Sequence, residues 1–249
     1  MKHVFAFYSK GLKALLEKID IGEELSFKDS DLWNRLTKIV RVGVGDKFII
    51  FDENLNATLE IKNNLSENKR VVSGIILEKK ENKLILPEIK LYLPVLKKDA
   101  LECSIYVSAQ MGVKDIFLIE TKKSQKKFDF EKEKDRLKKI MISACEQSKN
   151  FVLPEIKKPI GFKDIFDKNL EQKKVVKIFF DEDGEKISNL EKIYSRNKIE
   201  IIIGPEGGFT SEEKNFLKNF GFKPYKLTPT ILRSREAVCV GLGVLRSLI

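Results

Sequence analysis

The pattern of hydrophobic and polar positions changes near residue 84. Before that point, short apolar runs alternate with polar residues and turn signals, which is typical of β-strands. We predict strands at residues 47–53, 57–63 and 70–80, the first two joined by a short turn that contains asparagine. The first 70 or so residues are therefore expected to form a mainly β domain.

Beyond residue 84, apolar strands alternate with helical segments. Strands are predicted within 83–96 and at 115–120, 175–183, 199–204 and 225–228, and helices at 99–110, 130–148, 211–219 and 234–248. This alternation predicts an α/β domain with a mostly parallel sheet that helices cover on both faces. We place the small β domain at 1–72 and the α/β domain at 73–249, with the transition within 72–83.

The composition fits a globular protein, with 42% hydrophobic and 34% charged residues in a chain of 249. No apolar run approaches the roughly 18–20 residues that a membrane-spanning helix needs. Lysines interrupt the N-terminal residues too often for a secretory signal. We therefore expect a cytoplasmic protein without a membrane partner.

The scarcity of histidine and the spacing of cysteine exclude several kinds of active site. His3 is the single histidine, which excludes a Ser-His-Asp triad and an HExxH zinc site. Cys103, Cys145 and Cys239 are far apart and form no CxxC pair, so neither a disulfide framework nor a bound metal is expected. We interpret the cysteines as small core residues. The chemistry must rest on carboxylates, lysines, arginines, backbone amides or a cofactor.

The formal net charge of +10 is distributed unevenly. The first 70 residues are nearly neutral, whereas residues 121–149 carry an excess of lysine and arginine. The run TKKSQKK at 121–127 follows a predicted strand, where a loop is expected. Such a cluster attracts polyanions, including phosphate backbones. The alternative is a surface of solvated lysines.

The stretch IIIGPEGGFTSEE, residues 201–213, places three glycines directly behind a buried strand. Gly204, Gly207 and Gly208 let another molecule approach the backbone closely. Ligands of open α/β sheets bind at the carboxyl ends of the strands, which is where these glycines are predicted to lie. We expect a ligand held by backbone amides there. A tight turn with nothing bound is the alternative.

A helix-start signal follows the glycines, since Thr210 with Glu213 three residues later predicts a capping box. Two nucleotide-binding patterns are missing. No lysine follows the glycines as a P-loop requires, and VGVGD at 42–46 precedes a strand and lacks a third glycine, which argues against a dinucleotide fingerprint.

A second segment near the C-terminus is KLTPTILRSREAVCVGLGVLRSLI, residues 226–249. It opens with a Thr-Pro-Thr loop and an Ile-Leu pair, and then enters the last predicted helix through Arg233, Arg235 and Glu236. Two special loops that follow short strands are suited to wall one pocket. The alternative for the three charged residues is an ordinary salt-bridge cluster at a helix start.

At these residues the chain resembles the RsmE-type 16S ribosomal RNA uridine-N3 methyltransferases, which belong to the SPOUT class of S-adenosylmethionine enzymes. The resemblance rests on IGPEGGFTSEE followed by L-x-P-x-ILR-x-x-E-A. MGVKDIFLIETKKS, SACEQSKNFVLPEI and IVRVGVGDKFIIFD are similar to further segments of the family in the expected order. The resemblance spans nearly the whole chain. The chain departs from the family pattern at Thr228, Arg235, Lys123 and Asn150.

The resemblance implies an N-terminal PUA-like β-barrel domain and a SPOUT domain whose C-terminal part, about 199–249, forms a deep trefoil knot around S-adenosyl-L-methionine. It also implies a homodimer to which the final helix contributes. Carried over residue by residue, the cofactor-binding positions are Ile203, Gly204, Pro205, Gly207 and Gly208 on one wall, and Leu227, Ile231 and Leu232 on the other.

The implied reaction methylates N3 of a uridine in 16S ribosomal RNA of the small subunit. Without an available histidine, a carboxylate base or electrostatic stabilisation must deal with the N3 proton. Arg233 is predicted to stabilise negative charge on the uracil oxygens, and Glu206 or Glu236 to accept the proton or orient Arg233. The predicted contacts to the RNA backbone are Arg41, Lys122, Lys123, Lys126 and Lys127.

Three alternatives stay open on the sequence. A nucleotide-dependent or NAD-dependent enzyme is disfavoured by the missing motifs. A non-catalytic RNA-binding module would use only the β domain and the basic loop. A SPOUT enzyme that modifies ribose 2′-O or guanine N1 is the nearest alternative to a uridine enzyme.

Overall fold

The computed structural model describes residues 3–63, 65, 70–124, 128–165, 175–190 and 198–248. The chain divides into two compact units, the first comprising Met1–Lys83 with Cys145–Val152 and the second Leu84–Ala144 with Leu153–Ile249. The division falls after Lys83 rather than after residue 72, because one long strand, β5 (Val71–Glu81), pairs along its length with strands of the first unit.

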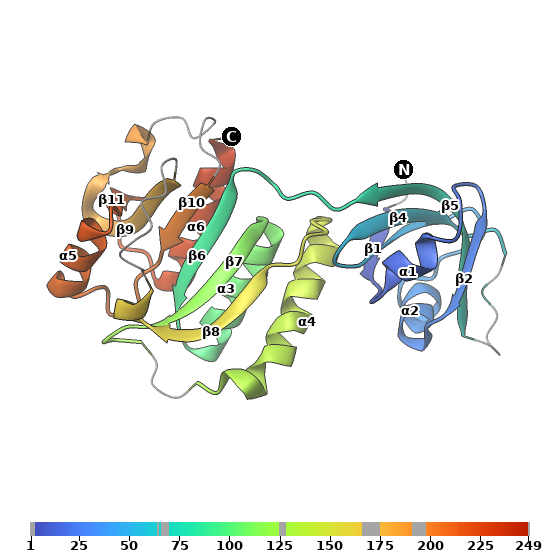
Figure 1. Ribbon diagram of the computed structural model, residues 1–249, viewed down its shortest axis with the longest axis horizontal. Coiled ribbons are helices and arrows are strands. Elements are labelled where there is room, and N and C mark those ends of the chain that lie inside the picture. The colour runs from blue at the N-terminus through green and yellow to red at the C-terminus, as the bar shows by residue number, and fades with distance from the viewer. Residues whose placement is uncertain are drawn as a thin grey trace. The chain divides into compact units, whose positions relative to one another are not determined.

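The first unit contains a five-stranded mixed sheet in the order β1-β3-β4-β5-β2 (Figure 1). Its other strands are β1 (Phe5–Tyr8), β2 (Glu24–Lys28), β3 (Lys47–Phe51) and β4 (Leu55–Glu60). β1 runs parallel to β3, and the remaining neighbours are antiparallel. β1 and β2 are the two edges of this order, and closure into a PUA-like barrel stays a prediction.

The three predicted strands of this unit are confirmed as β3, β4 and β5. The sequence did not predict β1, β2 or the helices α1 (Leu12–Leu16) and α2 (Ser30–Asn34). Each of these has four or five residues, which is too short to show a clear period.

A partly buried ion pair holds the returning segment 145–152 within the first unit. The guanidinium of Arg35 donates two hydrogen bonds to the Glu146 carboxylate, at 2.9 and 2.6 Å. The same carboxylate accepts a bond from the Tyr8 amide at 2.8 Å. The Arg35 guanidinium also lies 4.8 Å from the centre of the Phe7 ring. Forked charge-assisted bonds of this kind fix geometry as well as charge.

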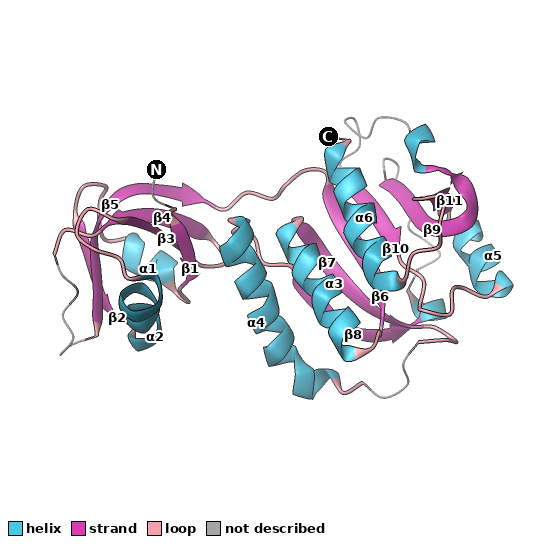
Figure 2. Cartoon of the chain, turned by 180° about the vertical axis from the view of Figure 1, so that it is seen from behind, coloured by secondary structure: helices cyan, strands magenta, loops and turns pink. Residues whose placement is uncertain are grey.

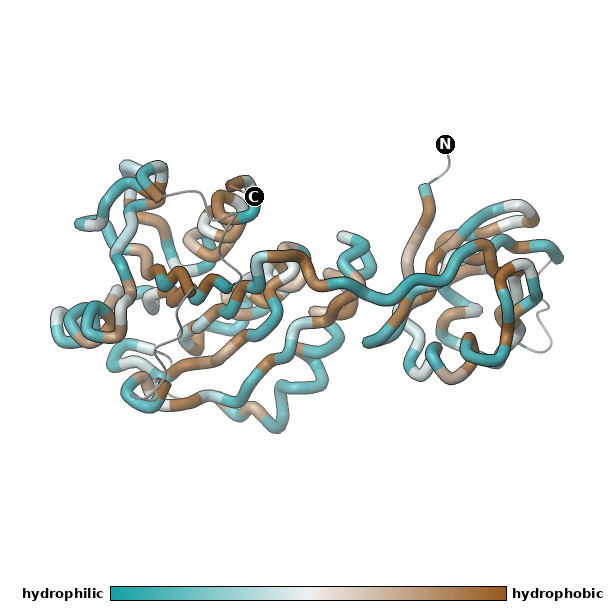
Figure 3. The backbone as a smooth tube through the Cα atoms, turned by 45° about the horizontal axis from the view of Figure 1, so that its top comes forward, coloured by the Kyte–Doolittle hydropathy of each residue, from teal (hydrophilic) through white to brown (hydrophobic). Residues whose placement is uncertain are grey.

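The second unit is built on a six-stranded sheet in the order β11-β9-β10-β6-β7-β8, in which every neighbouring pair is parallel. Its strands are β6 (Glu88–Pro94), β7 (Val113–Glu120), β8 (Glu155–Gly161), β9 (Val175–Lys186), β10 (Lys198–Ile202) and β11 (Lys223–Lys226). Figure 3 shows stretches of hydrophobic residues, in brown, within this unit. The predicted α/β class with a parallel sheet is therefore confirmed.

The helices of this unit are α3 (Lys98–Gln110), α4 (Phe130–Ser148), α5 (Ser211–Asn219) and α6 (Ser234–Ser247). α4 runs on into the segment assigned to the first unit. Figure 2 shows α3 and α6 side by side on one face of the sheet. On the opposite face, Leu217 of α5 joins a buried aromatic cluster with Tyr92, Phe179 and Phe222. Both faces are thus covered, as predicted.

The four predicted helices are confirmed to within a residue at each end. Gly112 has φ +66° just after α3, where the sequence predicted a terminating glycine. β11 begins and ends two residues earlier than predicted, and β8 was not predicted. The trefoil knot depends on the whole path of the chain, including residues outside the described ranges, and stays a prediction.

Of the three cysteines, Cys145 is buried, and burial raises the pKa of its thiol to about 12. Cys103 and Cys239 are only half-buried, so the prediction of a core position holds for Cys145 alone. Within the described residues, no helix is long and apolar enough to cross a membrane.

The end of α6 is fixed by Arg246. Its guanidinium donates to the carbonyl oxygens of Met111 and Gly112, both at 2.7 Å, and of Pro87 at 2.9 Å. Burial lowers the pKa of Arg246 to about 10, which leaves the group charged at neutral pH. Because three carbonyls depend on one cation, Arg246 holds the far end of the helix whose first residues reach the candidate site.

Candidate active site

The candidate site lies where β10 ends. β10 pairs with β6 on one side and with β9 on the other, and the amide of Ile203 extends the ladder by donating to Tyr92 O at 3.0 Å. From β6 the chain first adds β7 and β8 on one side and later β9, β10 and β11 on the other. Ligands of open α/β sheets bind at such a reversal, outside the carboxyl ends of the strands.

A cavity of about 280 Å³ occupies this position. Two loops wall it: the glycine loop, residues 203–209, and the Thr-Pro-Thr loop, residues 227–232. The structure brings together around it all the positions predicted for the cofactor, which are Ile203, Gly204, Pro205, Gly207, Gly208, Leu227, Ile231 and Leu232. Glu206, predicted for catalysis, also lines the cavity and is exposed.

The glycine loop is anchored at its end by Glu213. The predicted capping box is confirmed: the Glu213 amide donates to the Thr210 hydroxyl at 3.2 Å, and the Thr210 amide donates to Glu213 Oε2 at 2.8 Å. Oε1 of Glu213 also accepts a bond from the Lys122 amide at 3.1 Å. Since Glu213 is only 5% exposed, this carboxylate joins two segments in a largely buried place.

The middle of the glycine loop is held by Lys123. The Lys123 ammonium donates to the carbonyl oxygen of Gly207 at 2.7 Å. A Cβ on residue 207 would lie 2.8 Å from Cδ of Lys123, and Gly208 adopts φ +68°, which side-chain-bearing residues rarely adopt. The backbone conformation therefore favours glycine at 208, whereas a side chain at 207 would displace the Lys123 side chain from its place on the loop.

These contacts change the picture of the predicted RNA-binding lysines. Lys123 bonds the glycine loop, and Lys122 pairs with Glu212 at 2.5 Å, which raises the pKa of Lys122. Lys126 and Lys127 lie outside the described residues. The basic loop thus supports the cavity through at least one of its lysines.

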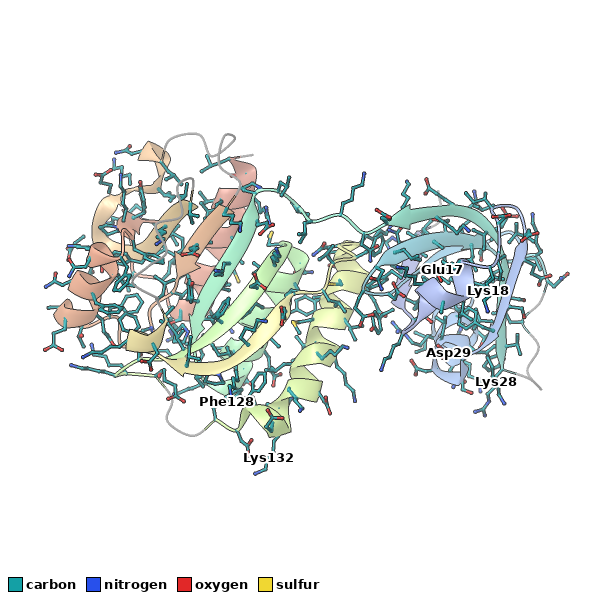
Figure 4. The ribbon with its side chains drawn as sticks, in the orientation of Figure 1. Glu17, Lys18, Lys28, Asp29, Phe128 and Lys132 are labelled. Carbon is teal, nitrogen blue, oxygen red and sulfur yellow. The ribbon has the colours of Figure 1, made fainter. Side chains whose placement is uncertain are left out.

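The basic residues at the start of α4 are also partly paired. Lys132 lies 2.9 Å from Asp129, and Lys134 lies 2.5 Å from Glu131. Figure 4 marks Lys132 in the first turn of α4, close to Phe128 just before the helix. Exposed pairs of this kind contribute little to stability, yet they reduce the local positive field.

The Thr-Pro-Thr loop has fewer bonds. Within it, the Thr228 hydroxyl donates to Thr230 O at 2.6 Å. Ile231 is 81% exposed, the largest exposure among the large hydrophobic residues described. The start of α6, just after this loop, is joined to the glycine loop by Ser234, whose buried hydroxyl donates to Gly204 O at 2.7 Å.

The middle of β9, just beyond its pairing with β10, adds an acidic wall that the sequence did not predict. Asp181 and Glu182 line the cavity together with Lys214 of α5. The Lys214 ammonium lies 2.6 Å from Asp181, whose side chain is 7% exposed, so that this carboxylate is neutralised. Glu182 is exposed, so that its negative charge can face a ligand in the cavity. The signal for this wall was FFDEDG, in which acidic residues directly follow a buried strand.

The other predicted catalytic residues lie at the edge of the cavity or beyond it. Arg233 is exposed, follows Leu232 and forms the N-cap of α6, but does not line the cavity. Glu236 does not line it either, and accepts hydrogen bonds from Arg235 at 2.9 and 2.5 Å. These bonds lower the pKa of Glu236, so that its carboxylate is a weaker base. Arg41 lies in the first unit and is exposed.

Comparison with known proteins gives a consistent result. The pattern of the RNA methyltransferase domain family matches residues 82–246. Ribosomal RNA small subunit methyltransferase E of Aquifex aeolicus is 32% identical over 182 residues, which is 72% of this chain and 77% of that protein. The protein of the same name from Buchnera aphidicola of Schizaphis graminum is 31% identical over 222 residues, 85% of either chain.

Two solved structures share the fold over nearly the full length. A ribosomal RNA small subunit methyltransferase E from Neisseria gonorrhoeae, bound to S-adenosyl methionine, has a TM-score of 0.80 at 22% identity and covers 99% of this chain and 98% of its own. A Legionella pneumophila protein in complex with the same cofactor has a TM-score of 0.77 at 25% identity, with the same coverage. Fold, family pattern and relatives agree: the chain belongs to the ribosomal RNA small subunit methyltransferase E family.

Proposed function

We propose that this protein transfers the methyl group of S-adenosyl-L-methionine to N3 of a uridine in 16S ribosomal RNA of the small ribosomal subunit. The observation that carries the proposal is the cavity at the end of β10, which gathers the eight cofactor positions implied by the family motif. Family membership supports RNA methylation, and the uridine N3 target rests on the resemblance of the two C-terminal loops.

The residues around the cavity fit this cofactor. Ile203, Leu227 and Leu232 offer apolar surface to an adenine ring, and the glycine loop offers backbone groups without side chains in the way. Glu182 and Glu206 place negative charge beside a ligand whose sulfonium is positive. S-adenosyl-L-methionine, when bound, supplies a methyl group on a positively charged sulfur that a nitrogen nucleophile can accept.

Residues of this chain remove the proton from N3 of the uridine and stabilise the resulting negative charge. We assign Glu206 as the proton acceptor, because it lines the cavity and is exposed to an incoming base, whereas Glu236 is bound to Arg235 and has a lowered pKa. Arg233, fixed at the start of α6 beside the Thr-Pro-Thr loop, is assigned to stabilise the negative charge that develops on the uracil oxygens. Its guanidinium stays charged and does not act as a base.

The function is tested by incubating the purified protein with labelled S-adenosyl-L-methionine and small subunits from a strain that lacks the family enzyme. Digestion and mass mapping then identify the methylated nucleotide. We expect one new N3-methyluridine in 16S RNA. A methyl group on a ribose 2′-oxygen or on guanine N1 would overturn the assigned target, and no transfer to RNA would overturn the function.

We further propose a homodimer formed through α6. Val238, Leu242 and Leu245 are buried within the unit, but Val240 and Val244 are only half-buried and leave apolar surface for a second copy. Light scattering is expected to give twice the chain mass, and Val244→Arg is expected to give monomers. A wild-type monomer at micromolar concentration would contradict this proposal.

A further inference from the structure

The first unit carries a hollow of about 470 Å³ that no part of the proposed reaction uses. It lies between the edge strand β1 and the turn between η1 (Arg35–Val40) and β3. Its lining includes His3, Phe5, Arg41 and Lys47. We call it the β1 hollow.

Its apolar wall includes an uncovered aromatic pair. The Phe5 ring lies 4.5 Å from the His3 ring in an edge-to-face arrangement, and Phe5 is 40% exposed. The next residues of β1, Ala6 and Phe7, are 5% and 3% exposed, so that the strand itself is well packed. Phe5 is therefore exposed by its position at the hollow, and not because β1 is loosely attached.

Two basic side chains and one acidic side chain line the hollow, which leaves an excess of positive charge. The side chains of Arg41 and Lys47 are exposed, and neither forms an ion pair or a side-chain hydrogen bond within the described residues. The carboxylate of Asp46 also lines the hollow, where it accepts a bond from the Gly43 amide at 2.9 Å and holds the turn. Two cations beside an aromatic pair therefore remain available to an anionic ligand.

The backbone at Arg41 supports a functional role for its side chain. Arg41 ends η1 with φ 59° and ψ 52°, in the left-handed region that favours glycine. A side chain in this region has an energetic cost, and such residues gather at functional sites. Glycine would adopt this backbone conformation at a lower energetic cost, yet position 41 is an arginine whose side chain lines the hollow.

We propose that the β1 hollow binds one unstacked nucleotide of single-stranded RNA. The base lies against Phe5 and His3, and Arg41 with Lys47 binds the adjacent phosphate. Proteins recognise single-stranded RNA by stacking bases on aromatic or guanidinium planes beside a basic groove. A duplex keeps its bases stacked and cannot present one to the hollow. The inference rests on the proposed function only in taking RNA as the substrate class.

The test measures binding of the full-length protein to a fluorescein-labelled oligouridine and to an RNA duplex of equal length. Phe5→Ala is expected to weaken oligouridine binding about tenfold, the order found for one stacked base, and to leave duplex binding within about twofold. Arg41→Gly is expected to weaken oligouridine binding by a similar factor while its melting temperature stays equal or rises.

Arg70→Gly is the matched control for Arg41→Gly. Arg70 is also exposed and has φ 46°, so that the exchange removes the same charge and the same backbone cost away from the hollow. It is expected to bind oligouridine within about twofold of the wild type. Calorimetric titration with S-adenosyl-L-methionine is expected to give the same cofactor affinity for the wild type and for the three variants. This measurement separates the inference from the proposed function.

Two results would overturn the inference. One is wild-type oligouridine affinity for both Phe5→Ala and Arg41→Gly. The other is an equal loss for Arg41→Gly and Arg70→Gly, which would reduce the effect to net charge. If the wild-type protein does not bind S-adenosyl-L-methionine, the proposed function is wrong. The RNA-binding result would still test the β1 hollow.

Discussion

The two loops that wall the cavity differ in how much of the chain holds them. The glycine loop is bonded in its middle by Lys123, is anchored at its end by the Glu213 carboxylate, and packs Phe209 into a buried aromatic cluster. The Thr-Pro-Thr loop has the Thr228 to Thr230 bond within it and leaves Ile231 81% exposed. One wall is preorganised, and the other has apolar surface still to be covered.

This difference assigns separate tasks to the two loops. A wall whose backbone is already ordered binds a ligand without a further entropic cost. The second wall leads into Arg233 and α6, where the stabilisation of the developing negative charge is assigned. Apart from Glu206, the assigned proton acceptor, we therefore expect changes in and around the glycine loop to act on cofactor affinity, and changes at Arg233, which follows the Thr-Pro-Thr loop, to act on the rate.

The largest effect is expected for Arg233→Ala. Loss of the guanidinium should lower the rate of methylation by about 100-fold or more, the order seen when one donor to a developing anion is removed. Cofactor affinity should stay within about twofold, because Arg233 does not line the cavity. Single-turnover kinetics and calorimetry measure the two quantities.

Arg235→Ala is the matched control, since Arg235 is the neighbouring arginine and bonds Glu236. We expect a much smaller loss of rate. A near-normal rate for Arg233→Ala, or equal losses for both variants, would remove Arg233 from the chemistry and erase the division of tasks between the loops.

The next effect is expected for Glu213→Ala. The exchange leaves the amides of Thr210 and Lys122 without their acceptor in a largely buried place, which should cost about 2–3 kcal/mol of the free energy of unfolding. Urea unfolding measures this cost, and cofactor affinity should fall with it as the glycine loop loosens. Glu212→Ala, at an exposed carboxylate, should leave both nearly unchanged. Equal effects of the two exchanges would show that the anchor is unimportant.

The glycine loop also shows which structural features can be predicted from the sequence. The capping box of Thr210 and Glu213 was predictable, because its partners are three residues apart and the spacing itself carries the signal. The long helices and central strands were predictable from their periodicity. The eight cofactor positions could be brought together only through the resemblance to a family motif, since 227–232 is distant from 203–209 along the chain.

Contacts between distant segments were not predictable. Nothing in the local sequence distinguishes Lys123, which bonds Gly207, from an exposed lysine that contacts RNA. Asp181 and Glu182 enter the cavity because β9 lies next to β10, an order that periodicity does not determine. The missed strands β1 and β2 share this cause, since pairing with β3 and β5 makes them strands.

A smaller effect is expected for Lys123→Met. Loss of one hydrogen bond to the Gly207 carbonyl should weaken cofactor binding about tenfold, the low end for a hydrogen bond that involves a charged group. Lys122→Met is the control from the same loop and should bind the cofactor as the wild type does. RNA affinity should fall equally for both, by the loss of one charge. If Lys123→Met keeps full cofactor affinity and loses more RNA affinity than Lys122→Met, its role is RNA contact and the glycine loop is ordered without it.

The smallest effect is expected for Ile231→Ser, and it addresses the other wall. Because Ile231 is 81% exposed, the exchange should change the free energy of unfolding by less than about 0.5 kcal/mol. Partial burial of the side chain against a bound cofactor would contribute about 1 kcal/mol, so cofactor affinity should fall about fivefold. Ile21→Ser, at a residue 60% exposed in the first unit, should change neither quantity. Unchanged cofactor affinity for Ile231→Ser would mean that the residue stays uncovered when the cavity is filled. The Thr-Pro-Thr loop would then be as complete before binding as the glycine loop, and the contrast between the two walls would disappear.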